Sequence, residues 1–84
     1  MREITIDCSQ ITEEAQLHQM LSEALQLPEW YGHNLDALFD CLTELEEDTH
    51  LILQNWDPDL HYSCSFEAVF TDAASYGCFA YTLA

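Results

Sequence analysis

Basic residues are almost missing from this chain: Arg2 is its only lysine or arginine, against 16 aspartates and glutamates. The formal net charge is −15 at pH 7. Because a nucleic-acid backbone is also an anion, this charge argues against direct binding of DNA or RNA. It favours a basic protein as the partner instead. A halophilic proteome, in which every protein surface is acidic, is the alternative explanation of the composition.

The chain also lacks the marks of several other protein classes. It shows no secretory signal and no transmembrane run, so we expect a cytoplasmic protein without membrane contact. Its four cysteines form no CxxC pair, and its four histidines have no close ligand spacing. We therefore expect reduced thiols, no metal and no cofactor.

Length and hydrophobic content indicate a folded protein. The 84 residues are 49% hydrophobic, which is too rich for a disordered acidic tail and enough for one modest core. We expect one domain over residues 1–84 and a monomer when the protein is free.

Hydrophobic spacing predicts strands that alternate with helices. Alternation predicts strands over 2–8 and 78–83, and an apolar run predicts a central strand over 49–54 that is buried on both faces. Apolar residues at helical spacing predict one helix after residues 11–14 and another after Ser65. His18 lies off the apolar face of the first of these helices, so we expect it to be solvated. Residues 57–62 form a turn or a short extra helix in this prediction.

The order of these elements predicts the topology. Strands joined by helical crossovers are parallel, and right-handed connections that advance one strand at a time place the helices on one face. We therefore predict a small two-layer α/β domain. It has a three-stranded parallel sheet in the order 1-2-3 and three to four helices.

Residues 27–47, LPEWYGHNLDALFDCLTELEE, carry the most informative pattern. Pro28 and Gly32 favour a stiff loop that we expect to display Trp30 and Tyr31, with Gly32 able to take a positive φ. Asn34 is a favoured N-cap, and apolar residues recur behind it at helical spacing. The sequence therefore predicts a shaped aromatic loop that leads into an amphipathic helix.

Two carboxylates share the face of this helix that avoids the core. Asp36 and Asp40 stand one turn apart, and like charges at this spacing cost an isolated helix roughly 0.2–0.5 kcal/mol. Asp36 lies in the first turn, where an acid complements the helix dipole, but Asp40 is too far along for that role. This face is therefore a candidate binding surface.

The segment from Leu27 to Thr43 resembles the signature segment of the barstar family, intracellular inhibitors of the ribonuclease barnase. A weaker similarity follows at Gly77 and Cys78, before the last strand. The resemblance implies the same fold and implies that the loop and helix plug a nuclease active site. The sequence departs from the family pattern at several positions, including Trp30 and Phe39, so the target need not be barnase itself.

The resemblance and the helix face together give a set of candidate partner-binding residues. They are Trp30, Tyr31, Gly32, His33, Asn34, Leu35, Asp36, Phe39, Asp40, Thr43, Glu44 and Asp72. Asp40 is the expected main mimic of a substrate phosphate, since a carboxylate accepts paired hydrogen bonds from arginine. Asp36 and Asp72 would widen the acidic site, and the aromatic residues would exclude water.

We therefore expect a bacterial inhibitor, not an enzyme, in a 1:1 complex with a small basic ribonuclease or a related toxin nuclease. The first alternative is an immunity protein of the same fold against a different toxic nuclease. A small acidic carrier or interaction protein is a weaker alternative, because the Asp-Ser-Leu attachment site of acyl carriers is absent. A hydrolase that uses Asp36 and Asp40 would need an enclosing pocket, which an exposed helix face does not supply.

Overall fold

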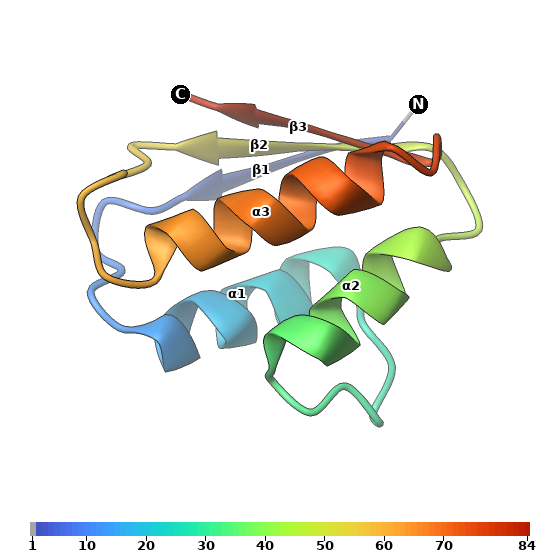
Figure 1. The fold of residues 1–84 in the computed structure, drawn as a ribbon, viewed down its shortest axis with the longest axis horizontal. Helices are drawn as coiled ribbons and strands as arrows, with labels where there is room; N and C mark the ends of the chain where they lie inside the picture. Colours follow the sequence, from blue (N-terminus) through green and yellow to red (C-terminus); the bar gives the residue numbers. More distant parts are fainter. Residues whose placement is uncertain (1) are drawn as a thin grey trace.

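A computed structural model describes residues 2–84 and contains one three-stranded parallel sheet in the order β1-β2-β3. The strands are β1 (Arg2–Asp7), β2 (Thr49–Gln54) and β3 (Phe79–Leu83). Three helices connect them: α1 (Glu14–Leu25), α2 (Leu35–Thr43) and α3 (Ser63–Ala74). All three lie on one face of the sheet (Figure 1). The predicted two-layer α/β fold and its strand order are confirmed.

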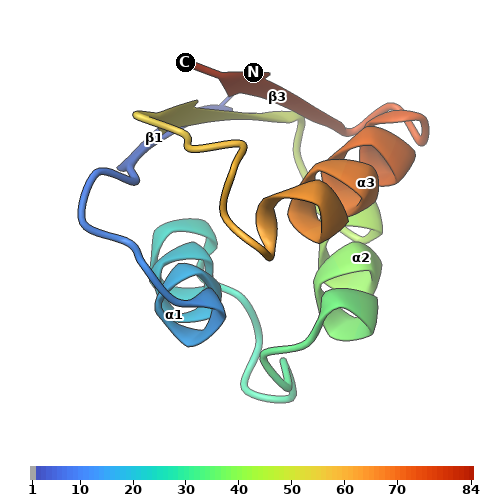
Figure 2. The ribbon, with the colours of Figure 1, turned by 60° about the vertical axis from the view of Figure 1, so that its left-hand side comes forward.

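The helical layer is itself uneven in depth. α3 packs against β3, and α1 packs against β1, whereas α2 packs mainly against α3. Figure 2 shows α2 below α3 and further from the sheet. One face of α2 is therefore left outside the core.

The sheet is covered on one face only, which corrects the prediction for β2. Thr49, Leu51 and Leu53 are buried, while His50 and Ile52 between them stay partly exposed. Both crossovers place their helices on the same side, so nothing in residues 2–84 covers the other side of β2. The strand is central, but it is not buried on both faces.

The side chain of Gln16 caps the start of α1. The side-chain oxygen Oε1 of Gln16 accepts hydrogen bonds from the backbone N–H groups of Thr12 at 2.9 Å and Glu13 at 3.1 Å. These bonds satisfy donors that the helix start leaves without partners. His18, predicted to be solvated, is only 1% exposed. It is buried because the loop after α1 folds back over this side of the helix.

α3 begins two residues before the predicted cap at Ser65. Ser63 is buried at its first position, and its hydroxyl donates to the carbonyl oxygen of Asp57 at 2.5 Å. Residues 57–62 form turns rather than an extra helix. Beyond α3, Gly77 takes a positive φ of 94° before the chain enters β3.

The core lies between the sheet and the helices. Its largest fully buried side chains are Phe66 and Phe70 of α3, whose rings are tilted against each other with centroids 6.1 Å apart. Phe70 continues the series onto Phe79 of β3. α3 is thus fixed to the sheet, and it supplies a rigid support for α2. Within residues 2–84, no helix has both the length and the apolar character needed to cross a membrane.

Candidate partner-binding surface

The start of α2 is fixed by its cap. Oδ1 of Asn34 accepts a hydrogen bond from the backbone N–H of Ala37 at 2.8 Å. Leu38 and Leu42 are fully buried, so they fix the rotation of the helix about its axis. Asp36 and Asp40 consequently point away from the core and are exposed.

Three of the predicted carboxylates meet in one groove between α2 and α3, which we call the acidic groove. Asp36 and Asp40 come from α2, and Asp72 comes from α3. The groove encloses about 350 Å³ and is completed by Leu35, Phe39 and Val69. Within residues 2–84, none of the three carboxylates takes part in an ion pair. The structure therefore brings together unneutralised negative charge and apolar surface.

The loop before α2 separates the two aromatic residues that were expected to be displayed together. Trp30 is 57% exposed, but Tyr31 is only 5% exposed, so the prediction that the loop displays Tyr31 is wrong. The Tyr31 hydroxyl hydrogen-bonds to Nδ1 of His18 on α1. Tyr31 therefore anchors the loop, because its hydroxyl finds its polar partner inside the protein.

Burial shifts the pKa values of the two hydrogen-bonded side chains, His18 and Tyr31. Burial lowers the pKa of His18, although the Glu14 carboxylate at 3.5 Å from Nε2 acts in the opposite direction. Burial raises the pKa of Tyr31. A neutral imidazole and a neutral phenol are thus the forms that suit this site.

The positive φ in the loop falls at His33, at 52°, and not at Gly32 as the sequence suggested. A Cβ at Gly32 would lie 3.0 Å from Nδ2 of Asn34, so a larger residue there would press on the side chain that caps α2. The exposed ring of His33 stacks on that of His18, with centroids 6.2 Å apart and planes 11° apart. The loop therefore packs tightly between the cap of α2 and the side of α1.

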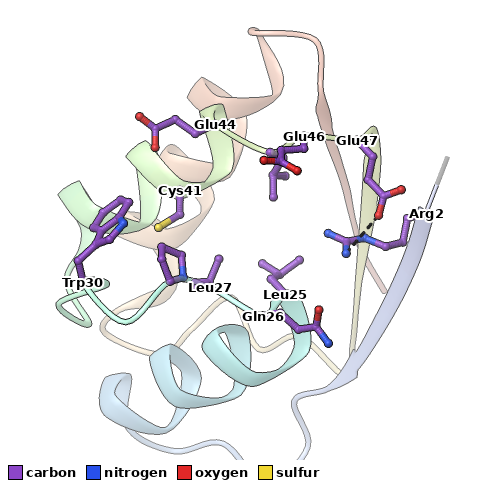
Figure 3. Close-up of a pocket in the computed structure, with 11 residues that line it drawn as sticks. Arg2, Leu25, Gln26, Leu27, Trp30, Cys41, Glu44, Glu46 and Glu47 are labelled. Atoms are coloured by element: carbon purple, nitrogen blue, oxygen red, sulfur yellow. Dashed lines mark ion pairs between the residues drawn. The ribbon is translucent and has the colours of Figure 1, made fainter.

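A second cavity of about 580 Å³ lies on the other side of α2 (Figure 3). Trp30 lies at one end of it and Arg2 at the other, with Glu44 and Cys41 along the α2 side. Nη1 of Arg2 pairs with Glu47 at 3.3 Å, and Nη2 donates to the hydroxyl of Thr49 at 3.2 Å. The one arginine is thus held away from the acidic groove.

Thr43, another predicted contact, is held by the end of α2. Its hydroxyl donates to the backbone carbonyl of Asp40 at 3.0 Å. Glu44 follows it as the C-cap.

Sequence reasoning missed Tyr76, which is 65% exposed. Its ring meets Phe39 edge to face, with centroids 5.7 Å apart and planes at 78°. Tyr76 lies in the turn after α3, so helical spacing in the sequence gave no signal for its position beside α2.

Residues 2–84 contain no group of three or more histidine, cysteine, aspartate or glutamate side chains arranged to hold a metal ion. The acidic groove is open to solvent, and carboxylates and apolar side chains line it.

Comparison with known proteins agrees with this description. A relative from Bacillus subtilis (strain 168), named "Putative ribonuclease inhibitor YrdF", is 41% identical over 58 residues. The aligned part is 68% of this chain and 64% of the relative, so the chain spans less than two thirds of that protein. The family described as Barstar (barnase inhibitor), a family of inhibitors rather than enzymes, matches residues 1–77. The chain therefore belongs to the Barstar family.

Proposed function

We propose that this protein inhibits a small basic ribonuclease by covering its active site with the acidic groove and the loop before α2. The observation that carries the proposal is the meeting of Asp36, Asp40 and Asp72 in one groove without an ion pair. A ribonuclease binds phosphates with basic side chains, and clustered carboxylates offer those side chains the same charge and the same acceptors. The inhibitor and the nuclease form a 1:1 complex inside the cell.

The apolar part of the surface supports the same function. Leu35, Phe39 and Val69 line the groove beside the acids, and Trp30 stands exposed at the loop. When a partner covers them, these side chains exclude water and strengthen each carboxylate's hydrogen bonds. Asp40 has Phe39 as its sequence neighbour and forms the centre of the proposed contact.

The surface is also organised before binding. The Tyr31–His18 hydrogen bond, the Asn34 cap and the bond from the Tyr31 N–H to the Pro28 carbonyl at 3.0 Å hold the loop. A loop that is already ordered loses less conformational entropy when a partner binds. The loop therefore supports tight binding even though some of its residues, such as the buried Tyr31, hold the loop in place and do not contact the partner.

The test is inhibition of barnase, the enzyme that the family description names. Barnase hydrolyses a fluorogenic RNA substrate while the chain is added in increasing amounts, and the activity should fall to zero at one equivalent. Asp40→Ala should lose this titration endpoint. Asp59→Ala removes another exposed carboxylate, from the turn before α3, and should keep the endpoint. Full ribonuclease activity with excess chain present would contradict the proposal for a barnase-type target.

A further inference from the structure

Tyr76 is the most exposed large aromatic residue in the described part of the chain. Its backbone N–H donates to the carbonyl oxygen of Ala73 at 3.1 Å, which holds Tyr76 in the turn directly after α3. Asp72 precedes it by four residues and lines the acidic groove. Asp72 therefore lies in the last turn of α3, and Tyr76 lies in the turn that follows the helix.

Phe39 connects this ring to the acidic groove. Phe39 lines the groove beside Asp36 and Asp40, and the edge-to-face contact with Tyr76 extends its ring surface outward from α2 to the end of α3. Tyr76 is exposed and Phe39 is partly exposed, so ring surface of the pair is accessible to a partner. The pair forms an aromatic wall next to three carboxylates.

We propose that this wall, made of Phe39 and Tyr76, makes the acidic groove selective for an arginine side chain of the basic partner over a lysine. A guanidinium group is planar and weakly hydrated, so it stacks on an aromatic ring while its edge donates to carboxylates. A lysine ammonium group is compact and strongly hydrated, and it responds mainly to the charge. Tyr76 is thus a specificity-determining residue. The identity of the partner rests on the proposed function.

The experiment compares two peptides of equal charge, hexa-arginine and hexa-lysine, by calorimetric titration at low salt. The intact chain should bind hexa-arginine more tightly. Tyr76→Leu, which keeps apolar area but removes the ring, should weaken hexa-arginine binding by about two- to fivefold, the range for a cation–π contact at an exposed site. Tyr76→Phe keeps the ring and should keep the preference. Binding of hexa-lysine should stay the same in all three proteins.

Two further measurements test whether the preference for arginine comes from the Phe39–Tyr76 pair. Ring protons of Phe39 and Tyr76 should shift in NMR spectra when hexa-arginine binds, and Asp59→Ala should not alter the ratio of the two affinities. An unchanged ratio in Tyr76→Leu, or an equal loss for both peptides, overturns the assignment. Failure of the proposed function gives a different result, because barnase then stays active whatever happens to the peptide preference.

Discussion

Asp40 contributes less to the stability of the fold than Asp36, the other carboxylate that α2 supplies to the acidic groove. Asp36 lies in the first turn of α2, where a negative charge is favourable, whereas Asp40 lies beyond that turn and has no ion pair within residues 2–84. Its contribution to the fold is therefore small, and its contribution to binding can be measured separately.

We predict that Asp40→Ala weakens binding of the target nuclease by about 2 kcal/mol or more, as at a central contact that becomes desolvated. The free energy of unfolding should change by no more than about 0.5 kcal/mol, as for a surface substitution. Inhibition titrations and urea denaturation measure the two quantities. Asp59→Ala is the control, and equal affinities for Asp40→Ala and the parent would remove Asp40 from the contact.

His18 gives the fold a pH dependence. Tyr31, Glu14, His33 and Phe66 surround its ring, and burial lowers its pKa from the ordinary value of 6.5. The unfolded chain therefore takes up a proton near pH 6.5, while the folded chain does so only at lower pH. The stability from neutral His18 is fully present above pH 6.5 and is lost as pH falls below it.

We therefore expect the free energy of unfolding to fall between pH 7.5 and pH 5.5, with a slope of at most about 1.4 kcal/mol per pH unit for one proton. Urea denaturation at several pH values measures it. His18→Gln should flatten the profile, and His61→Gln, which changes an exposed histidine, should not. A flat profile in the parent protein would show that the pKa of His18 is the same in the folded and unfolded states.

At the scale of elements, the acidic groove belongs to a pair of helices. α2 packs against α3 rather than against the sheet, so the exposed faces of both helices meet at one line. Asp72 joins Asp36 and Asp40 only because of this packing. The position of α2 in turn depends on the cap and loop that precede it.

Asn34→Ala tests that dependence. The substitution removes the acceptor for the Ala37 N–H, and loss of such a cap costs about 0.5–2 kcal/mol of stability. Binding to the nuclease should weaken as well, because the loop and the first turn of α2 become less ordered. Thermal denaturation and hydrogen exchange at Ala37 provide the measurements. Asn34→Asp retains a capping acceptor and should behave like the parent; equal exchange in Asn34→Ala would show that the cap does not hold the helix start.

At the scale of the whole molecule, the charge of −15 acts over distances longer than any contact. The one arginine is paired with Glu47, so it does little to offset the field near the acidic groove. A basic nuclease should therefore be drawn toward this surface before it docks.

The predicted result is an association rate well above the roughly 10⁵–10⁶ M⁻¹s⁻¹ of neutral partners, falling steeply as sodium chloride is raised toward physiological ionic strength. Stopped-flow fluorescence with the nuclease measures it, and the exposed Trp30 supplies a signal. The dissociation rate should change much less with salt. A salt-independent association rate would indicate that hydrophobic contact, without steering, controls the encounter.

Local patterns in the sequence determined much of this protein. Apolar alternation and helical spacing located the strands and the main helices, since both depend on backbone periods of a few residues. The right-handed crossover rule then gave the strand order. The spacing of Asp36 and Asp40 was enough to place them on one outward face, because residues four apart on a helix point the same way.

Only the tertiary structure decided which of the remaining candidates are exposed and which meet. Trp30 and Tyr31 are neighbours of similar chemistry, yet α1 covers one of them and leaves the other in solvent. Tyr76 contacts Phe39, a residue of the acidic groove, because α2 packs against α3. Exposure and proximity depend on the packing of segments that are distant in sequence. The periodicity of apolar residues along the chain contains no information about that packing.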